Sequence, residues 1–238
     1  MSKAVVLARS VKPEWLDKTV EILLDNNDSD RNEIKERINE YLSNYIKSST
    51  NLRKTREILL NIWFDIDEEI LDFRTRAFEI YKETKQSDRL GIHWAMILLA
   101  FPIFKDLCII IGKLADMQDE VQLSQIRRRV FELWGERTTL LHSIDKNIKT
   151  LKDFNVLEQK KPGVYKVIKH EIKNKEVACM LLYAVFKSSD KLYHSFSDID
   201  KFMELFPFEN NLELDDLNQC GLFTMDRIGG ETVVSIVK

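Results

Sequence analysis

The chain has 238 residues, of which 44% are hydrophobic, 10% aromatic and 32% charged. These values are typical of a folded protein with a core and exclude a disordered or fibrous chain. Only 7 Gly and 4 Pro are present, too few for the many turns of a β-sandwich or β-barrel. We therefore expect a mainly α-helical fold, and the length allows one large domain or two small ones.

The formal net charge of -3 conceals an uneven distribution. Residues 122–175 hold 13 Lys and Arg against 6 Asp and Glu, a balance of +7. The balance is -4 before this block, with 18 against 22, and -6 after it, with 5 against 11. A like-charged block repels itself unless an anion compensates it, which suggests an anionic partner. The alternative is a solvated basic face that pairs with the acidic flanks.

Cysteine, histidine and hydropathy patterns exclude several classes. Three distant cysteines and four histidines show neither a disulfide framework nor metal-ligand spacing. The longest apolar stretch, residues 94–104, is shorter than the ~20 residues that span a bilayer. The first residues contain no secretory signal. We expect a cytoplasmic protein without a metal or cofactor, whose cysteines are buried thiols.

Residues 13–85 carry four helix signatures, the first with Pro13 at its start and the third capped by Thr50 or Asn51. Acidic residues at 65–72 fit a helix start, with a metal site as the alternative. Two apolar helices, residues 91–100 and 102–115, should form the centre of the fold and break before Pro102. We expect His93 to be a hydrogen-bonded core histidine, with a general base as the alternative.

A more specific pattern begins at residue 123. One helix face ends at Gly135, a second helix runs through residues 143–153, and Asn155 suits the left-handed stop. Two short β-rich runs, residues 156–159 and 164–168, then flank Pro162-Gly163 and predict a hairpin. Helix, turn, helix and hairpin in this order predict a winged helix, whose second helix enters the DNA major groove.

If Ile144, Ile148 and Leu151 face the core, the exposed or flanking arc of the second helix is polar. The predicted DNA-binding residues on this helix are Ser143, Lys146, Asn147, Lys149, Thr150 and Lys152. Others lie at the hairpin tip and on the preceding helix, namely Lys160, Lys161, Arg127 and Arg128, with Arg129 beside them. Only Asn147 suits a bidentate contact to adenine. We therefore expect weak sequence preference and strong salt dependence.

The earlier helix pair, residues 34–45 and 52–63, also resembles a helix-turn-helix. Its second helix starts with Arg53, Lys54 and Arg56, which form a possible second DNA patch. No hairpin follows, so the alternative is a plain α-hairpin with solvated charges.

After residue 175 the composition becomes acidic. We expect helices at 177–186, 198–205 and 212–220 and a hairpin with a turn at Gly229-Gly230. The acidity suggests that this segment contacts other protein components, or the basic block of this chain, instead of DNA. The expected organisation is an N-terminal helical region (1–100), a basic winged-helix domain (101–175) and an acidic α+β segment (176–238).

The residues at about 52–157 resemble a known family. The similarity extends from Leu52-Arg-Lys-Thr-Arg56, through the apolar segment 94–99 and Phe104-Lys-Asp106, to residues 144–152 and Asn155-Val-Leu157. They resemble the BrxA family of small proteins from the BREX phage-defence system. The resemblance implies a helical protein with a winged-helix element that binds duplex DNA beside larger enzymes.

Four functions remain open. The first is a non-enzymatic DNA-binding component. The others are a transcriptional regulator with its own operator, a helical adaptor that binds only protein, and an enzyme. No phosphate loop, nucleophile elbow or paired catalytic carboxylate motif is present, so we do not expect an enzyme.

Overall fold

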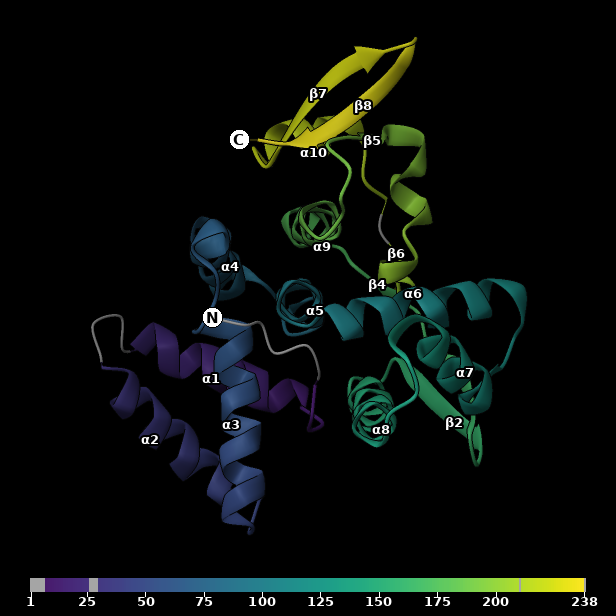
Figure 1. Cartoon of the computed structure of the whole chain (residues 1–238). Helices are drawn as coiled ribbons and strands as arrows, with labels where there is room; N and C mark the ends of the chain where they lie inside the picture. The colour runs from purple at the N-terminus through teal and green to yellow at the C-terminus, as the bar shows by residue number, and fades with distance from the viewer. Residues whose placement is uncertain (1–6, 26–29, 210, 238) are drawn as a thin grey trace.

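The computed structural model describes residues 7–25, 30–209 and 211–237 (Figure 1). The described chain is mainly helical with small sheets, which confirms the predicted mixture of mostly α with a little β. Two predictions fall partly outside these ranges. They are the break at residues 25–30 after the first helix and the absence of a secretory signal, which was argued from residues 1–9.

The first four helices follow the predicted order. They are α1 (Pro13–Asp25), α2 (Arg31–Ser43), α3 (Ser49–Trp63) and α4 (Leu71–Glu83), with a 3-10 turn, Glu68–Ile70, before α4. The start of α3 differs from the prediction, because the Ser48 side chain, not that of Thr50 or Asn51, accepts the hydrogen bond from the Asn51 N–H. Helices α1, α2 and α3 lie together on one side of the molecule (Figure 1).

Three apolar helices form the centre: α5 (Arg89–Ala100), α6 (Pro102–Met117) and α9 (Lys175–Lys187). The predicted break before Pro102 is confirmed, and the axes of α5 and α6 bend by 117° there. Trp94 on α5 is fully buried, and its Nε1 donates to the Glu204 carbonyl at 3.0 Å. In the described ranges no single helix is long and apolar enough to cross a membrane. Among the described helices, only α5 and α6 taken together reach the required length and apolar composition, and they are sharply bent at Pro102.

The elements after α6 are β1 (Val121–Gln122), α7 (Leu123–Trp134), α8 (Thr138–Asp153), β2 (Leu157–Lys161) and β3 (Val164–Val167). Their antiparallel sheet has the order β1-β3-β2. Asn155 follows α8 with φ 56°, as predicted for a left-handed helix stop, and Gly163 has φ 73° in the hairpin turn. The predicted sequence of two helices and a hairpin is therefore present.

The C-terminal part packs on α9 and the end of α6 (Figure 1). A parallel pair joins β4 (His170–Glu171) to β6 (Phe208–Glu209), and the last sheet has the order β5-β8-β7. Its strands are β5 (His194–Ser195), β7 (Phe223–Ile228) and β8 (Glu231–Ile236), and the helix α10 (Leu214–Gln219) lies between β5 and β7 in the chain. The short helix predicted at 198–205 is present as two 3-10 helices, Phe196–Lys201 and Met203–Leu205.

Buried apolar side chains from Leu7 to Val234 form one contiguous cluster, to which all three predicted regions contribute. The cysteines are free and buried, as expected. The boundaries at residues 100 and 175 remain predictions.

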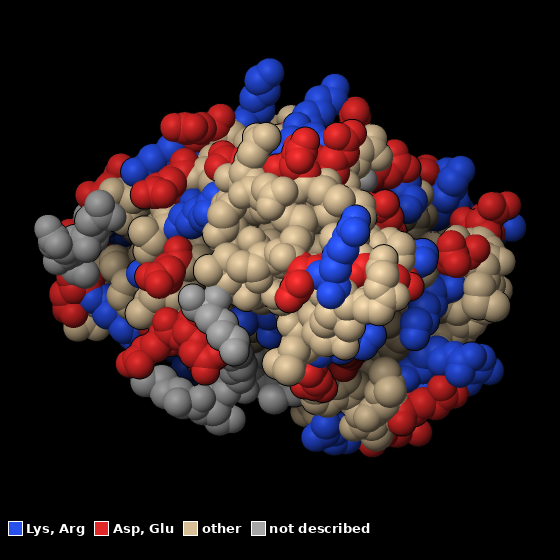
Figure 2. Space-filling model, turned by 90° about the horizontal axis from the view of Figure 1, so that it is seen from above, with Lys and Arg blue, Asp and Glu red and all other residues tan. Residues whose placement is uncertain are grey.

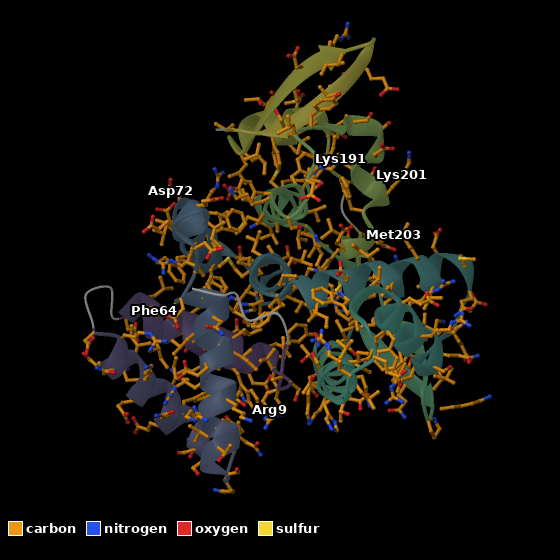
Figure 3. All side chains as sticks on the ribbon, in the orientation of Figure 1. Arg9, Phe64, Asp72, Lys191, Lys201 and Met203 are labelled. Carbon is orange, nitrogen blue, oxygen red and sulfur yellow. The ribbon has the colours of Figure 1, made fainter. Side chains whose placement is uncertain are left out.

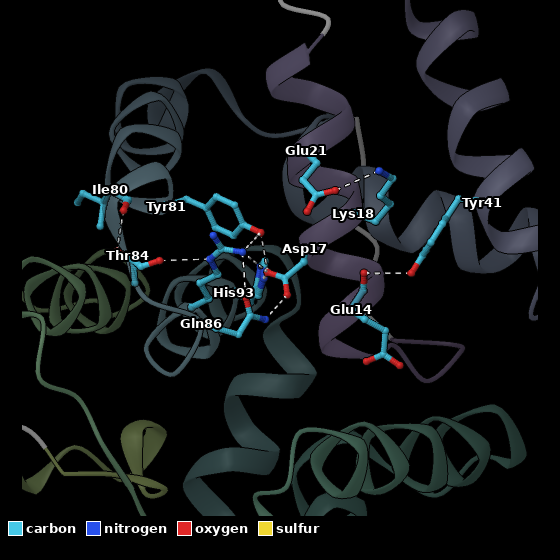
Figure 4. A network of polar contacts seen from close by, with 11 residues as sticks. Glu14, Asp17, Lys18, Glu21, Tyr41, Ile80, Tyr81, Thr84, Gln86 and His93 are labelled. Atoms are coloured by element: carbon cyan, nitrogen blue, oxygen red, sulfur yellow. Dashed lines mark hydrogen bonds and ion pairs between the residues drawn. The ribbon is translucent and has the colours of Figure 1, made fainter.

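A buried polar network joins α1, α4 and α5 (Figure 4). Asp17 accepts hydrogen bonds from the Tyr81 hydroxyl and from Gln86, each at 2.7 Å, and lies 3.1 Å from His93 Nε2. His93 is fully buried, so the prediction of a hydrogen-bonded core histidine is confirmed. Burial alone would raise the pKa of Asp17, but the hydrogen bond and attraction from His93, with the bonds from Tyr81 and Gln86, lower it to about 2.

This network predicts a pH dependence of stability. The lowered pKa of Asp17 contributes about 2 kcal/mol that is present above its usual pKa of 3.8 and is lost as the pH falls towards 2. Urea unfolding at a series of acidic pH values checks this. The Asp17→Asn variant should lose about 2 kcal/mol less than the wild type across that window, and an equal loss in both proteins contradicts the assignment.

Candidate nucleic-acid interface

Hydrogen bonds between neighbouring elements fix α7, α8 and the β2–β3 hairpin relative to one another. The Leu123 N–H at the start of α7 donates to the carbonyl of Gly163 in the hairpin turn at 2.8 Å. Trp134 at the end of α7 donates to Asp106 on α6 at 2.9 Å. An ion pair of 2.7 Å joins Arg127 on α7 to Asp145 on α8. The residues that a duplex would contact are therefore held on a rigid frame.

Helix α8 has a broad buried face and a narrow exposed stripe. As predicted, Ile144, Ile148 and Leu151 are buried. The exposed side chains of α8 are Thr138, Thr139, His142, Lys149 and Lys152. The Lys152 ammonium donates to Gln159 of the hairpin at 2.6 Å, so the stripe continues onto β2. Two of the three predicted lysines thus lie on the exposed stripe, and Lys146 is half-buried at its border.

Three predicted contact residues are buried, so their placement on the exposed arc was wrong. Ser143 is 2% exposed, and Asn147 and Thr150 are 0% exposed. The Asn147 amide donates to the Ser143 carbonyl at 2.8 Å, one turn away. These three side chains point into the protein and are not accessible to an outside ligand.

Residues 7–11, which we name the strap, cover this polar side of α8. The Ser143 hydroxyl donates to the Leu7 carbonyl at 3.3 Å, and the Val11 N–H donates to the Thr150 hydroxyl oxygen at 3.1 Å. Leu7 and Val11 are both fully buried. The strap therefore fastens the N-terminal segment to α8 by apolar packing and by hydrogen bonds at two points two turns apart.

Several cations on α7 and the hairpin have carboxylate partners. Arg128 and Arg129 both pair with Glu132, at 3.9 and 3.1 Å, and Lys160 pairs with Glu158 at 2.7 Å. These are exposed pairs, which contribute little and exchange readily with an outside anion.

Lys146, Lys149 and Lys161 have no side-chain hydrogen bond or ion pair with any residue that the structure describes. The Asp153 carboxylate interacts electrostatically with Lys149, but burial raises the pKa of Asp153 against the opposing effect of that lysine. The cations from the exposed face of α8 to the hairpin tip therefore form no ion pair with the described residues, although the Asp153 carboxylate interacts electrostatically with Lys149 and Lys152.

The residues of the possible second DNA patch, Arg53, Lys54 and Arg56, differ in their exposure. Arg56 is turned inward, with a side chain only 13% exposed, and it bonds Glu57 at 2.6 Å and Asn39 on α2 at 3.0 Å. Arg53 is exposed and lines a groove between α2 and α3. Lys54 is exposed without an ion pair among the described residues. Arg56 therefore links α2 and α3, although it also lines the groove beside Arg53, and its part in a second DNA patch stays a prediction.

Two other surfaces carry both signs of charge. Seen from above, the face that carries β7 and β8 intermixes Lys and Arg with Asp and Glu (Figure 2). A groove of about 1060 Å³ between α6 and the C-terminal part is lined by equal numbers of cations and anions. They are Lys166, Lys169, Lys173, Lys175 and Lys201 against Asp116, Asp119, Glu171, Asp200 and Glu209. Neither surface matches the exposed stripe on α8, whose lysines have no ion-pair partner among the described residues.

Within the described residues no group of three or more metal-ligand side chains is close enough to hold an ion, and this includes the acidic cluster at 65–72. Comparison with protein families, curated proteins and solved structures finds no match.

Proposed function

We propose that residues 102–167 form a winged helix and that the protein is a non-enzymatic component that binds duplex DNA in the cytoplasm. The order α6, β1, α7, α8, β2, β3 and the sheet order β1-β3-β2 support this assignment, since the hairpin lies beside the end of α8. A role in a BREX-like phage-defence system, next to partner proteins that contact the acidic C-terminal part, extends the proposal.

One observation carries the proposal. The exposed stripe of α8 and the hairpin tip hold Lys149, Lys152 and Lys161, none of them paired with a carboxylate of the described chain. Three exposed cations without ion-pair partners on two adjoining elements attract a polyanion, and a duplex offers phosphates at regular spacing.

The expected mode of binding is insensitive to sequence. Asn147 was the one predicted residue suited to reading adenine, and it is buried. The exposed stripe offers His142 and two threonines, with lysines that contact phosphates. This favours a general DNA-binding component over a transcriptional regulator that recognises one operator.

Fluorescence anisotropy with several unrelated duplexes at a series of salt concentrations tests the proposal. We expect similar dissociation constants for all duplexes and a steep fall of log K with log salt, because phosphate contacts release counterions. No binding at low salt contradicts DNA binding, and one tight duplex that survives high salt favours the regulator.

The hairpin makes a separate prediction. Replacing Lys160 and Lys161 by alanine should lower the salt slope by about 1 to 2, up to one unit for each lost phosphate contact. The fold should persist because both side chains are exposed. The matched control replaces Lys82 and Lys85, two exposed lysines near the end of α4. An equal slope for wild type and the hairpin variant removes the hairpin from the interface.

A further inference from the structure

The strap holds a cation, Arg9, near both α3 and α8. The sequence pattern gave no reason to place Arg9 near either of the two predicted helix-turn-helix pairs. Arg9 lies between α3 and α8 (Figure 3). Its Nη2 donates to Asn51 Oδ1 in the first turn of α3 at 3.0 Å, and its Nη1 donates to the neighbouring Ala8 carbonyl at 2.8 Å. Both partners are neutral, so the guanidinium charge is positioned without being compensated.

Lys54 lies on α3, one turn after the residue that accepts the Arg9 hydrogen bond. It is three residues after Asn51, the acceptor of the Arg9 hydrogen bond, and residues at this spacing are neighbours on one helix face. The side chain is exposed and has no ion pair among the described residues.

Lys146 lies beside the strap on α8. It is three residues after Ser143 and four before Thr150, the two residues that hydrogen-bond the strap at Leu7 and Val11. Arg9 is the central residue between these two strap contacts. Lys146 therefore lies on the face of α8 that carries the two strap contacts, and its ammonium has no hydrogen bond or ion pair with the described residues.

We infer that Arg9, Lys54 and Lys146, the strap cluster, bind the phosphate backbone of the same duplex that the winged helix contacts. The three cations come from three separate elements and repel one another unless an anion lies between them. The strap is anchored to α8 and to α3, which keeps the cluster fixed relative to the proposed DNA-binding stripe. This inference rests on the proposed function and extends its surface from the hairpin and α8 to the start of α3.

The strap also explains why buried polar residues lie on α8. Ser143 and Thr150 hold the strap at two points, and these bonds place Arg9 between them. Their role is positioning, while the phosphates are bound by the cations at the edge of the strap.

The test uses the full chain and a duplex of about 20 bp, roughly two helical turns. The triple variant Arg9→Gln, Lys54→Gln and Lys146→Gln should lower the slope of log K against log salt by about 3, near one unit for each phosphate contact. The double variant Lys54→Gln with Lys146→Gln should lower this slope by about 2. Because it leaves the Arg9 hydrogen bonds in place, a lower slope in this variant cannot come from a misfolded strap. Lys82→Gln with Lys85→Gln is the matched control and should leave the slope unchanged.

The outcomes separate the two proposals. A wild-type slope in both cluster variants, with the hairpin variant still weakened, overturns the strap cluster and leaves the winged-helix interface standing. No duplex binding by the wild-type chain overturns both. A fall in slope for the cluster variants that is absent in the control supports the cluster. Inorganic phosphate at matched ionic strength should not displace the duplex, and displacement would assign the cluster to free phosphate.

Discussion

Replacing Lys149 and Lys152 by glutamate is expected to weaken duplex binding by about 100-fold or more at low salt. A hydrogen bond to a charged group is worth about 1.5 to 3 kcal/mol, so loss of two such contacts amounts to about 3 kcal/mol, or roughly two decades in the dissociation constant. The added negative charges then repel the phosphates. Anisotropy titration of wild type and variant measures the effect.

The same variant should remain folded. Both lysines are exposed, and among the described residues the variant loses one side-chain hydrogen bond, from Lys152 to Gln159, and the attraction of the two lysines to Asp153. We expect the free energy of unfolding to change by less than about 1 kcal/mol. Lys82→Glu with Lys85→Glu adds the same charge near the end of α4 and controls for net charge. Equal weakening in the control would show that net charge alone, not the α8 stripe, governs binding.

The second large effect concerns the inward face of α8. Ile148 is 3% exposed, and Ile148→Ala should lower the free energy of unfolding by about 2 to 5 kcal/mol, because it removes buried methyl groups and leaves a cavity. The adjacent Lys149→Ala is the matched control and should cost less than about 0.5 kcal/mol. Urea unfolding measures both. A stable Ile148→Ala protein would mean that α8 is rotated from the orientation described.

Local patterns predicted the elements well. The apolar helices α5 and α6 and the break between them follow from hydrophobicity and from Pro102, whose ring disfavours the helical conformation of Phe101. The two hairpins follow from Pro162-Gly163 and Gly229-Gly230, since each glycine adopts positive φ. These features depend on neighbours in sequence, which is why the sequence alone was sufficient.

The accessible face of α8 depends on a distant segment and was not predictable in this way. Ser143 and Leu7 are 136 positions apart, and helical periodicity carries no information about such a contact. One signal was present: the three misplaced residues are small or uncharged, whereas Lys146, Lys149 and Lys152 at the next positions are cations. If only the charged positions of α8 had been assigned to its exposed face, and the uncharged polar positions to the interior, the predicted DNA-binding face would have kept the three lysines and lost the three buried residues.

Arg56 illustrates a related limit. Its neighbour Glu57 was visible in the sequence, but the bond to Asn39 required α2 and α3 to pack face to face. Arg9 lay in a segment without a helical or strand pattern, so periodicity gave no reason to place it near either helix pair.

Lysine acetylation footprinting, read by mass spectrometry with and without a saturating duplex, tests the central claim most directly. The account predicts that DNA protects Lys149, Lys152 and Lys161 from modification, while Lys82 and Lys85, which are also exposed, react at the same rate with and without DNA. Unchanged reactivity of the α8 and hairpin lysines under conditions where the duplex is bound would contradict the account.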